Sequence, residues 1–270
     1  MATGDRLHFI GNATTVLTLG SFTLLTDPNF IHRGQRAYLG WGLSTRRLVD
    51  PAIEPEDLPA LDAVVLSHLH GDHFDRVARH RLDRTAPVLS TPEAARRLSR
   101  WGFETQDLRT WQAHSLVKGG EELRVTAVPG IHARGLLGKM LPSVMGSILE
   151  HVVDGDVRRR VYLSGDTLTG SHVDEIGARF PDIDAAVVHL GGTRVLMRTV
   201  TMDARMGVDF VNRCRPSVVV PVHHDDYTVF RSPLSDFLDR ARAEGLAATL
   251  RCPGRGEVVS LDPTEPDTAA

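Results

Sequence analysis

Cysteine is scarce in this chain of 270 residues, with only Cys214 and Cys252 present. Two cysteines cannot build a disulfide framework, and their separation is not typical of metal ligands, so we expect a reducing compartment, the cytoplasm. The N-terminal residues lack the basic segment and apolar core of a signal peptide. No apolar run reaches the roughly 18 residues of a membrane span, so none is expected.

Strong charge of either sign is also lacking. The formal net charge of -3 provides no basic surface for nucleic acid, and a nucleic-acid partner is therefore not expected. With 41% apolar and 24% charged residues, the composition is that of an ordinary globular protein that can bury a substantial core. We expect one domain over residues 1–262 and a disordered tail at 263–270.

The pattern of apolar residues predicts an α/β protein with paired sheets. Residues 6–28 are expected to form three short strands, whereas the glycines and prolines of 29–60 favour a long surface loop. Further strands are expected at 63–67, 122–129, 145–153, 160–164, 185–189, 217–222 and 256–261. Helices are expected from about 74, after the N-cap Thr91, and at 171–180, 203–213 and 233–244.

Histidine is abundant, with 13 residues, and three of them lie in the segment "VVLSHLHGDHFD" directly behind a predicted buried strand. His68 and His70 are two positions apart, so on an extended segment both side chains point to one side and can share one metal ion. Gly71 permits a sharp turn, after which Asp72 and His73 diverge and more naturally serve a second ion. A polar loop with hydrogen-bonded histidines is the alternative interpretation.

Such a site needs further ligands, and three candidates follow predicted strands. His132 lies beyond the strand in "RVTAVPGIHARG", Asp166 follows "RRVYLSG", and His223 follows "PSVVVPV". Each of these, taken alone, is compatible with an ordinary loop residue or helix cap.

The order of these motifs resembles the metallo-β-lactamase superfamily. The segment "FIGNATTVLTLGSFTLLTDPNF" and the later "GGTRVLMRTVTMDARMGVDFVNRCRPSVVVPVHHDD" are similar to the branch that contains ascorbate-phosphate lactonases and N-acylphosphatidylethanolamine phospholipase D. The resemblance spans Leu7 to Asp225 and implies an αβ/βα sandwich of two mixed β-sheets flanked by helices. His224 directly follows His223; we assign His223 as the ligand because it keeps the Pro-x-His spacing.

The resemblance also implies two divalent metal ions. One would be held by His68, His70 and His132, the other by Asp72, His73 and His223, with Asp166 bridging both. Zinc suits this shell best, and manganese or iron is compatible with it. Asp72 and Asp166 would be catalytic through a metal-bridging hydroxide, since metal coordination makes water a nucleophile at neutral pH.

Other residues carry weaker expectations. Asp27 could orient a ligand histidine or simply cap a turn. His189, Arg134 and Lys139 are candidates for substrate contacts, against a buried structural role for His189 and a solvated loop for the other two.

The function that follows is a metal-dependent hydrolase acting on a lactone or other small ester, whose substrate could be anionic. The alternatives are a phosphodiesterase for a lipid or nucleotide, which an apolar groove beside the metals would favour, and a non-catalytic metal-binding protein. The sequence is also compatible with a homo-oligomer.

Overall fold

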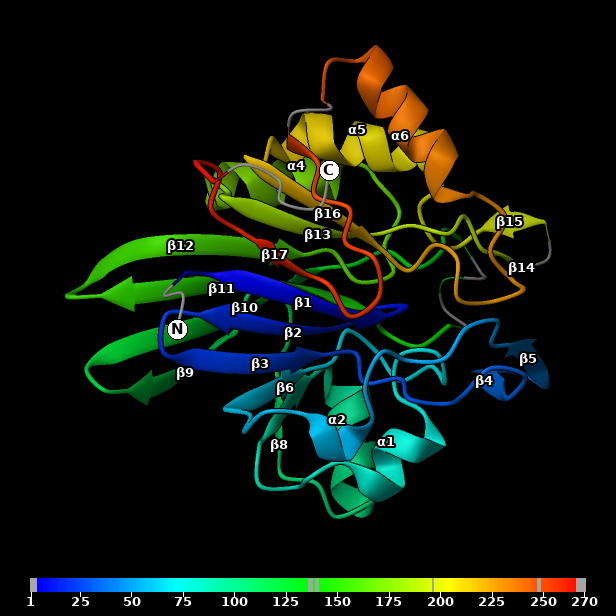
Figure 1. Ribbon diagram of the computed structural model, residues 1–270, viewed down its shortest axis with the longest axis horizontal. Coiled ribbons are helices and arrows are strands. Elements are labelled where there is room, and N and C mark those ends of the chain that lie inside the picture. Colours follow the sequence, from blue (N-terminus) through cyan, green and yellow to red (C-terminus); the bar gives the residue numbers. More distant parts are fainter. Residues whose placement is uncertain (1–3, 136–137, 139–140, 196, 247–248, 266–270) are drawn as a thin grey trace.

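The chain forms a four-layer sandwich in which two sheets face each other and helices cover both outer faces (Figure 1). The structure is a computed structural model that describes residues 4–135, 138, 141–195, 197–246 and 249–265. The expected tail at 263–270 therefore lies largely outside the described residues. No helix in the described part of the chain is long and apolar enough to cross a membrane.

The N-terminal sheet has seven strands in the order β17-β1-β2-β3-β6-β7-β8. Strands β1 to β3 pair antiparallel, whereas β3, β6, β7 and β8 run parallel. Their bounds are β1 (Arg6–Gly11), β2 (Thr14–Leu19), β3 (Phe22–Thr26), β6 (Ala63–Val65), β7 (Val88–Ser90), β8 (Thr105–Asp107) and β17 (Val258–Ser260).

The C-terminal sheet has six strands in the order β16-β13-β12-β11-β10-β9. Strands β9 to β12 pair antiparallel, and β12, β13 and β16 run parallel. The bounds are β9 (Ala113–Lys118), β10 (Glu121–Pro129), β11 (Met145–Val153), β12 (Asp156–Leu163), β13 (Ala185–His189) and β16 (Val218–Val222). Both sheets are thus mixed, as expected.

Three apolar clusters hold the layers together. Residues from both sheets, such as Leu24 and Leu149, pack in the space between them. Helices α4 (Ser171–Arg179), α5 (Ala204–Cys214) and α6 (Leu234–Ala243) cover the C-terminal sheet, and α1 (Arg76–Arg81) and α2 (Pro92–Arg100) cover the N-terminal one. The parallel strands β13 and β16 are buried along their whole length, which explains their continuous apolar sequences. The predicted α/β sandwich is confirmed.

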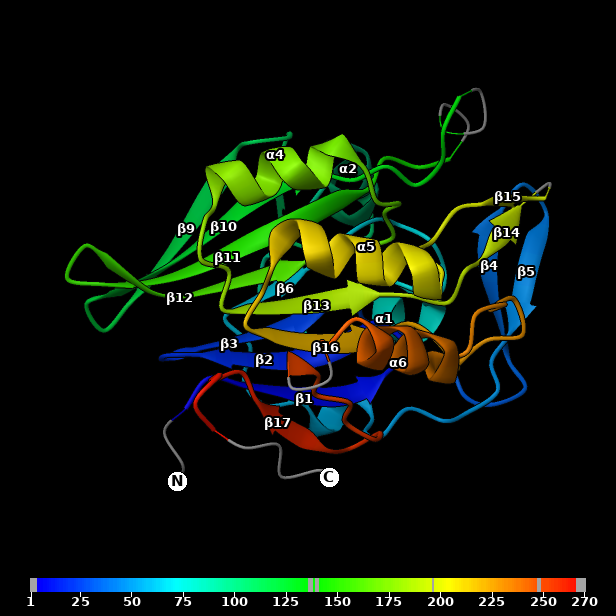
Figure 2. The ribbon, with the colours of Figure 1, turned by 90° about the horizontal axis from the view of Figure 1, so that it is seen from above.

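The expectation of a long surface loop over 29–60 is wrong. This segment contains the hairpin β4 (Arg36–Gly40) and β5 (Leu43–Arg46) and the short helix η1 (Pro55–Asp57). Figure 2 shows that this hairpin projects at the same end of the molecule as a second one, β14 (Arg194–Val195) and β15 (Arg198–Thr199). Periodicity did not reveal these strands, nor β7, β8 and β9, because they are short or partly exposed.

A buried ion pair fastens the 29–60 segment to the body of the protein. Arg47 and Asp226 are both fully buried, and an Arg47 Nη2 lies 3.3 Å from Asp226 Oδ1. The other end of the Arg47 guanidinium donates to both side-chain and backbone oxygens of Asn29. Arg255 also pairs with Asp226, at 3.0 Å. Because each charge has partners, the burial is tolerable, but loss of one partner would leave the others only partly compensated.

Replacing Arg47 with methionine should lower the free energy of unfolding by about 3 kcal/mol. This is the lower end of the range for a broken buried pair, since Arg255 still neutralises Asp226. Urea denaturation of Arg47→Met beside Arg46→Met, whose side chain is exposed on the same hairpin, provides the measurement. Equal stability of the two variants would contradict the anchoring role.

Candidate metal centre

The candidate ligands gather at one edge of the sandwich because parallel strands end there. Strands β6, β12 and β16 lead directly into the segments that carry His68, Asp166 and His223. Strand β10 runs in the same direction as β12, since both pair antiparallel with β11, and it leads to His132. The carboxyl ends of parallel strands meet at one edge of a sheet, so residues far apart in sequence converge there.

The first group consists of His68, His70 and His132. Ligand atoms of the three side chains lie within 4.8 Å of one another. His68 Nε2 and His70 Nδ1 are only 2.8 Å apart, and all three residues are buried. His132 Nδ1 donates to the carbonyl of Val200 at 2.8 Å, which leaves its Nε2 as the free electron-pair donor.

The second group consists of Asp72, His73 and His223, whose ligand atoms also lie within 4.8 Å of one another. His223 Nδ1 donates to the carbonyl of Leu190 at 3.1 Å, and its Nε2 lies 3.5 Å from Asp72 Oδ2. His223 has a φ of 62°, a left-handed conformation that is costly for a residue with a side chain. The surrounding structure therefore holds this imidazole in place.

Asp166 lies between the two groups. One of its oxygens is 3.3 Å from His73 Nε2 and the other is 3.5 Å from His223 Nδ1. Together with His68 and His73 it forms a third set of converging ligand atoms. Gly165 before it has a φ of 59° and a Cβ there would lie 2.7 Å from the Met145 carbonyl, so only glycine allows this turn.

Four of the candidate ligand atoms are buried and have no hydrogen-bond partner in the described part of the chain. They are Asp72 Oδ1, His73 Nε2, Asp166 Oδ1 and His223 Nε2. Unsatisfied buried polar groups are rare because each costs free energy, and a cluster of carboxylate oxygens and imidazole nitrogens is a donor set that suits divalent cations. The residues therefore fit the metal centre implied by the sequence resemblance.

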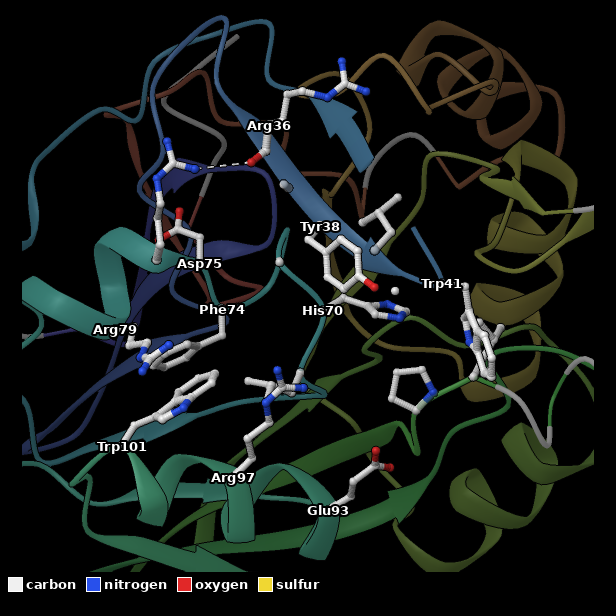
Figure 3. A pocket seen from close by; sticks show the side chains of 18 residues that line it. Arg36, Tyr38, Trp41, His70, Phe74, Asp75, Arg79, Glu93, Arg97 and Trp101 are labelled. Atoms are coloured by element: carbon white, nitrogen blue, oxygen red, sulfur yellow. Dashed lines mark hydrogen bonds between the residues drawn. The ribbon is translucent and has the colours of Figure 1, made fainter. Parts of the chain in front are cut away.

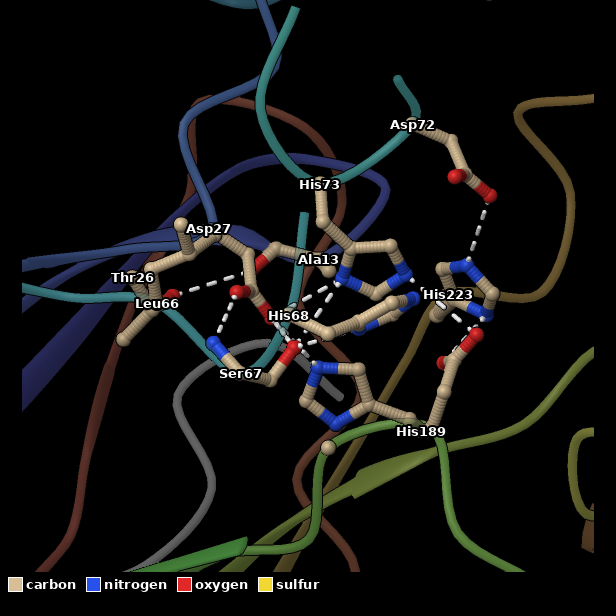
Figure 4. A network of polar contacts seen from close by, with 12 residues as sticks. Ala13, Thr26, Asp27, Leu66, Ser67, His68, Asp72, His73, His189 and His223 are labelled. Carbon is tan, nitrogen blue, oxygen red and sulfur yellow. Dashed lines mark hydrogen bonds and ion pairs between the residues drawn. The ribbon is translucent and has the colours of Figure 1, made fainter. Parts of the chain in front are cut away.

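Behind the ligands, the buried carboxylate of Asp27 receives four hydrogen bonds (Figure 4). Ser67 donates from its backbone at 2.7 Å and from its hydroxyl at 3.0 Å, and His73 Nδ1 and His189 Nε2 lie at 3.0 and 3.3 Å. Burial by itself raises the pKa of Asp27, but His73 and His189 overcome it and lower this pKa to about 2. Asp27 thus orients His73, a candidate ligand, which favours one of the two roles that the sequence left open.

The two groups differ in their affinity for protons. Burial lowers the pKa of His68 and His132, and that of His70 to about 4, so these imidazoles are neutral at neutral pH. Burial also opposes a charge on His73 and His223, but the carboxylate of Asp166 raises the pKa of both. This difference arises because the carboxylates of Asp72 and Asp166 lie beside His73 and His223.

Of the remaining sequence candidates, only His189 lies at the centre, where it forms a further converging group with Asp27 and His73. His189 is buried, bonded to Asp27 and Ser164. Arg134 is exposed and donates to the carbonyl of Thr169, and Lys139 lies outside the described residues. His224 belongs to none of the converging groups.

Sequence reasoning missed Ser67, whose hydroxyl donates to Asp27 and lies 3.0 Å from His68 Nδ1. Its position directly before the histidine cluster was the available signal. It also missed the carbonyls of Leu190 and Val200, which orient two histidines and leave no mark in the side-chain pattern.

Paired mixed sheets with such a strand-end centre define a class of metal-dependent hydrolases. Residues 23–224 match the family model described as the beta-lactamase superfamily domain, and the chain belongs to this family. It is 27% identical over 205 residues to a UPF0173 metal-dependent hydrolase of Nanoarchaeum equitans, an alignment that covers 75% of this chain and 87% of the relative. The chain is thus a metal-dependent hydrolase of this superfamily.

Two solved structures share the fold. One is the isothiocyanate hydrolase from Delia radicum gut bacteria, with a TM-score of 0.80 and 22% identity over 94% of this chain and 98% of that one. The other is a possible metal-dependent hydrolase from Veillonella parvula, with a TM-score of 0.79 and 24% identity over 96% and 100% of the two chains.

Gly71 lies in the expected turn, where the N–H groups of His73 and Phe74 donate to the His70 carbonyl, and it also holds the histidine segment against the β4–β5 hairpin. Its φ is not in the left-handed region, but its N–H donates to the Tyr38 carbonyl at 2.8 Å, and a Cβ would lie 2.7 Å from the Tyr38 backbone. Gly71→Ala should therefore push the hairpin away and cost about 1–3 kcal/mol of stability. Gly177→Ala on α4, where a Cβ has room, should be neutral or stabilising. Urea denaturation with limited proteolysis of the hairpin tests this; an unchanged cleavage rate in Gly71→Ala would contradict it.

Proposed function

We propose that this protein is a dinuclear hydrolase of an ester-type bond, with a lactone or other small ester as substrate. The observation that carries the proposal is the set of four unsatisfied buried atoms of Asp72, His73, Asp166 and His223, beside the three clustered histidines 68, 70 and 132. His68, His70 and His132 would hold one ion and Asp72, His73 and His223 the other, with Asp166 shared. Zinc is the proposed metal, because imidazoles dominate the donor set.

When bound, such ions lower the pKa of a coordinated water from about 15.7 towards about 7 and polarise an ester carbonyl. The chain's own residues prepare the centre. Asp27 accepts from His73 Nδ1, so that His73 Nε2 faces Asp166. The Val200 and Leu190 carbonyls fix the tautomers of His132 and His223 in the same way. Asp72 and Asp166 add the negative charge that offsets part of the charge of two ions.

The size of the neighbouring pocket supports a small substrate. A pocket of about 690 Å³ adjoins His70, within the range of typical small-molecule sites, about 300–1,000 Å³. A compact lactone with a polar arm fits such a volume. The likeness to ascorbate-phosphate lactonases points the same way. We further propose that the protein works in the cytoplasm, as its low cysteine content suggests.

A phosphodiesterase is the second candidate, because apolar side chains line part of this pocket. Tyr38, Leu69, Phe74, Trp101 and Leu141 would contact the apolar portion of a lipid or nucleotide phosphodiester. The fold likeness to an isothiocyanate hydrolase adds isothiocyanates to the substrates worth testing.

Zinc-loaded protein should cleave small lactones with a kcat/KM at least about tenfold above that for bis(4-nitrophenyl) phosphate or phenethyl isothiocyanate. A neutral lactone has a carbonyl oxygen that metal ions can polarise, whereas the phosphodiester is an anion that repels hydroxide and the isothiocyanate has no oxygen. Steady-state kinetics with all three substrates on one preparation decides between the candidates. A preference for the phosphodiester would replace the first candidate by the second. Hydrolysis of none of them would reject both.

Metal analysis tests the centre itself. Purified zinc-loaded protein should contain two ions per chain, and Asp166→Ala should lower this content and reduce kcat/KM about a thousandfold or more, because both ions lose a shared ligand. His224→Ala serves as the control, since His224 belongs to no ligand group, and should keep both ions. Circular dichroism verifies folding of each variant. Two ions and full activity in Asp166→Ala would refute the shared role of this carboxylate.

A further inference from the structure

The pocket beside His70 is enclosed by two parts of the chain that are remote from each other in sequence. The β4–β5 hairpin contributes Tyr38 and Trp41, while α1 and α2 contribute Arg79 and Arg97 from the opposite side (Figure 3). The Gly71–Tyr38 hydrogen bond fastens the hairpin to the histidine segment, so the pocket and the metal centre share a wall. Whatever binds in the pocket therefore lies next to His70.

The pocket is rich in arginine. Four arginines contribute to its lining, Arg36, Arg76, Arg79 and Arg97. Arg36 donates to Ser44 of its own hairpin, and Arg76 donates to the Arg36 carbonyl. In the described part of the chain, none of the four forms an ion pair with a carboxylate, although exposed arginines elsewhere, such as Arg81, are paired.

Arg79 and Arg97 converge on one aromatic ring. Their guanidinium carbons lie 4.3 and 5.3 Å from the centroid of Trp101. Cation–π contacts hold the two like charges near one another, and they leave the N–H groups available to a ligand. In Figure 3 the Arg97 side chain extends from α2 towards the middle of the pocket.

The two acidic residues of the lining do not neutralise these charges. Asp75 is buried and accepts from the backbone N–H groups of Phe30, Ile31 and Ala78, so its carboxylate is already occupied. Glu93, one turn before Arg97 on α2, accepts from the backbone of Ser143 at 3.3 Å and forms no ion pair within the described residues. The pocket therefore has an excess of positive charge, unlike the protein as a whole.

We propose that this pocket binds the anionic arm of the substrate, with Arg97 and Arg79 as the specificity-determining residues. The ligand is an organic monoanion or dianion, a carboxylate or phosphate, attached to a flat or apolar body. The anion lies between the two guanidinium groups, the apolar body packs against Trp101 and Phe74, and the scissile bond points to His70. Arginine N–H groups recognise both anions through paired hydrogen bonds. The substrate assignment rests on the proposed hydrolase function, whereas anion binding by itself does not.

Direct binding tests the pocket on zinc-loaded full-length protein. The probes are naphthalene-2-sulfonate, an aromatic anion and a weak zinc ligand, and 2-naphthol, its neutral counterpart. Isothermal titration calorimetry should show the sulfonate binding about tenfold more tightly than 2-naphthol. Arg97→Gln should raise the Kd of the sulfonate about tenfold, and Arg97→Lys should restore part of the affinity, because charge-assisted hydrogen bonds dominate the contact. Arg100→Gln, on the same helix but outside the pocket, should leave the Kd unchanged.

Elemental analysis of each variant serves as the control and should give the same zinc content as the wild-type protein. A parallel hydrolysis assay compares a neutral lactone with its carboxylated analogue, and the ratio of their kcat/KM values should fall about tenfold in Arg97→Gln. Equal affinity of wild-type protein for the two probes, or a sulfonate Kd unaffected by Arg97→Gln, would overturn the proposal. If neither lactone is cleaved while the sulfonate still depends on Arg97, the proposed lactone substrate fails and the anion site stands.

Discussion

The carboxylate of Asp27 is the group on which the architecture of the centre depends. It follows β3 of the N-terminal sheet, and its hydrogen bonds reach Ser67 after β6, His73 in the histidine segment and His189 at the end of β13 in the other sheet. A buried carboxylate needs several donors, and here the donors come from both sheets. The requirement to satisfy one charge therefore aligns the edges of the two sheets and orients a candidate metal ligand.

A second buried charge organises the surroundings of the centre. Asp226 pairs with Arg47 and Arg255 and accepts from the backbone N–H of Asn12, whose own carbonyl receives the N–H of His223. Arg47 in turn binds Asn29, which also donates to Asp75 at the start of α1. One chain of polar contacts thus connects His223, the 29–60 segment and helix α1, which lines the pocket. Because low dielectric strengthens each of these bonds, loss of one is felt by its neighbours.

The two sides of the site have different tasks. The strand-end edge concentrates imidazoles and carboxylates and is largely buried, with His70 at its border to the pocket. The pocket beside it is open, aromatic and cationic, and it is formed by the β4–β5 hairpin and by the outer faces of helices α1 and α2. Reactive groups on rigid strand ends and recognition groups on the surrounding loops are a common arrangement, since loops can vary without disturbing the scaffold. Relatives with the same fold can therefore act on other substrates.

The sequence alone predicted the longer core strands and most of the helices from local patterns, and the order of its strand-end residues, through the family resemblance, predicted the seven candidate ligands. Apolar runs of strand length mark β11, β13 and β16, and metal-competent residues directly after such runs mark the edge. Their role as metal ligands remains a prediction, although the structure brings them into overlapping groups. Only the tertiary structure decided what surrounds them. Arg47 and Asp226 are 179 positions apart. The hydrogen bond from the Gly71 N–H to the Tyr38 carbonyl joins two segments whose contact no periodicity in the sequence indicates. Arg79 and Arg97 look like ordinary exposed helix residues until folding places both beside Trp101. Burial and pairing of charges depend on long-range packing, whereas strand ends follow from local hydrophobicity, and for this reason the pocket could not be predicted while the candidate centre could.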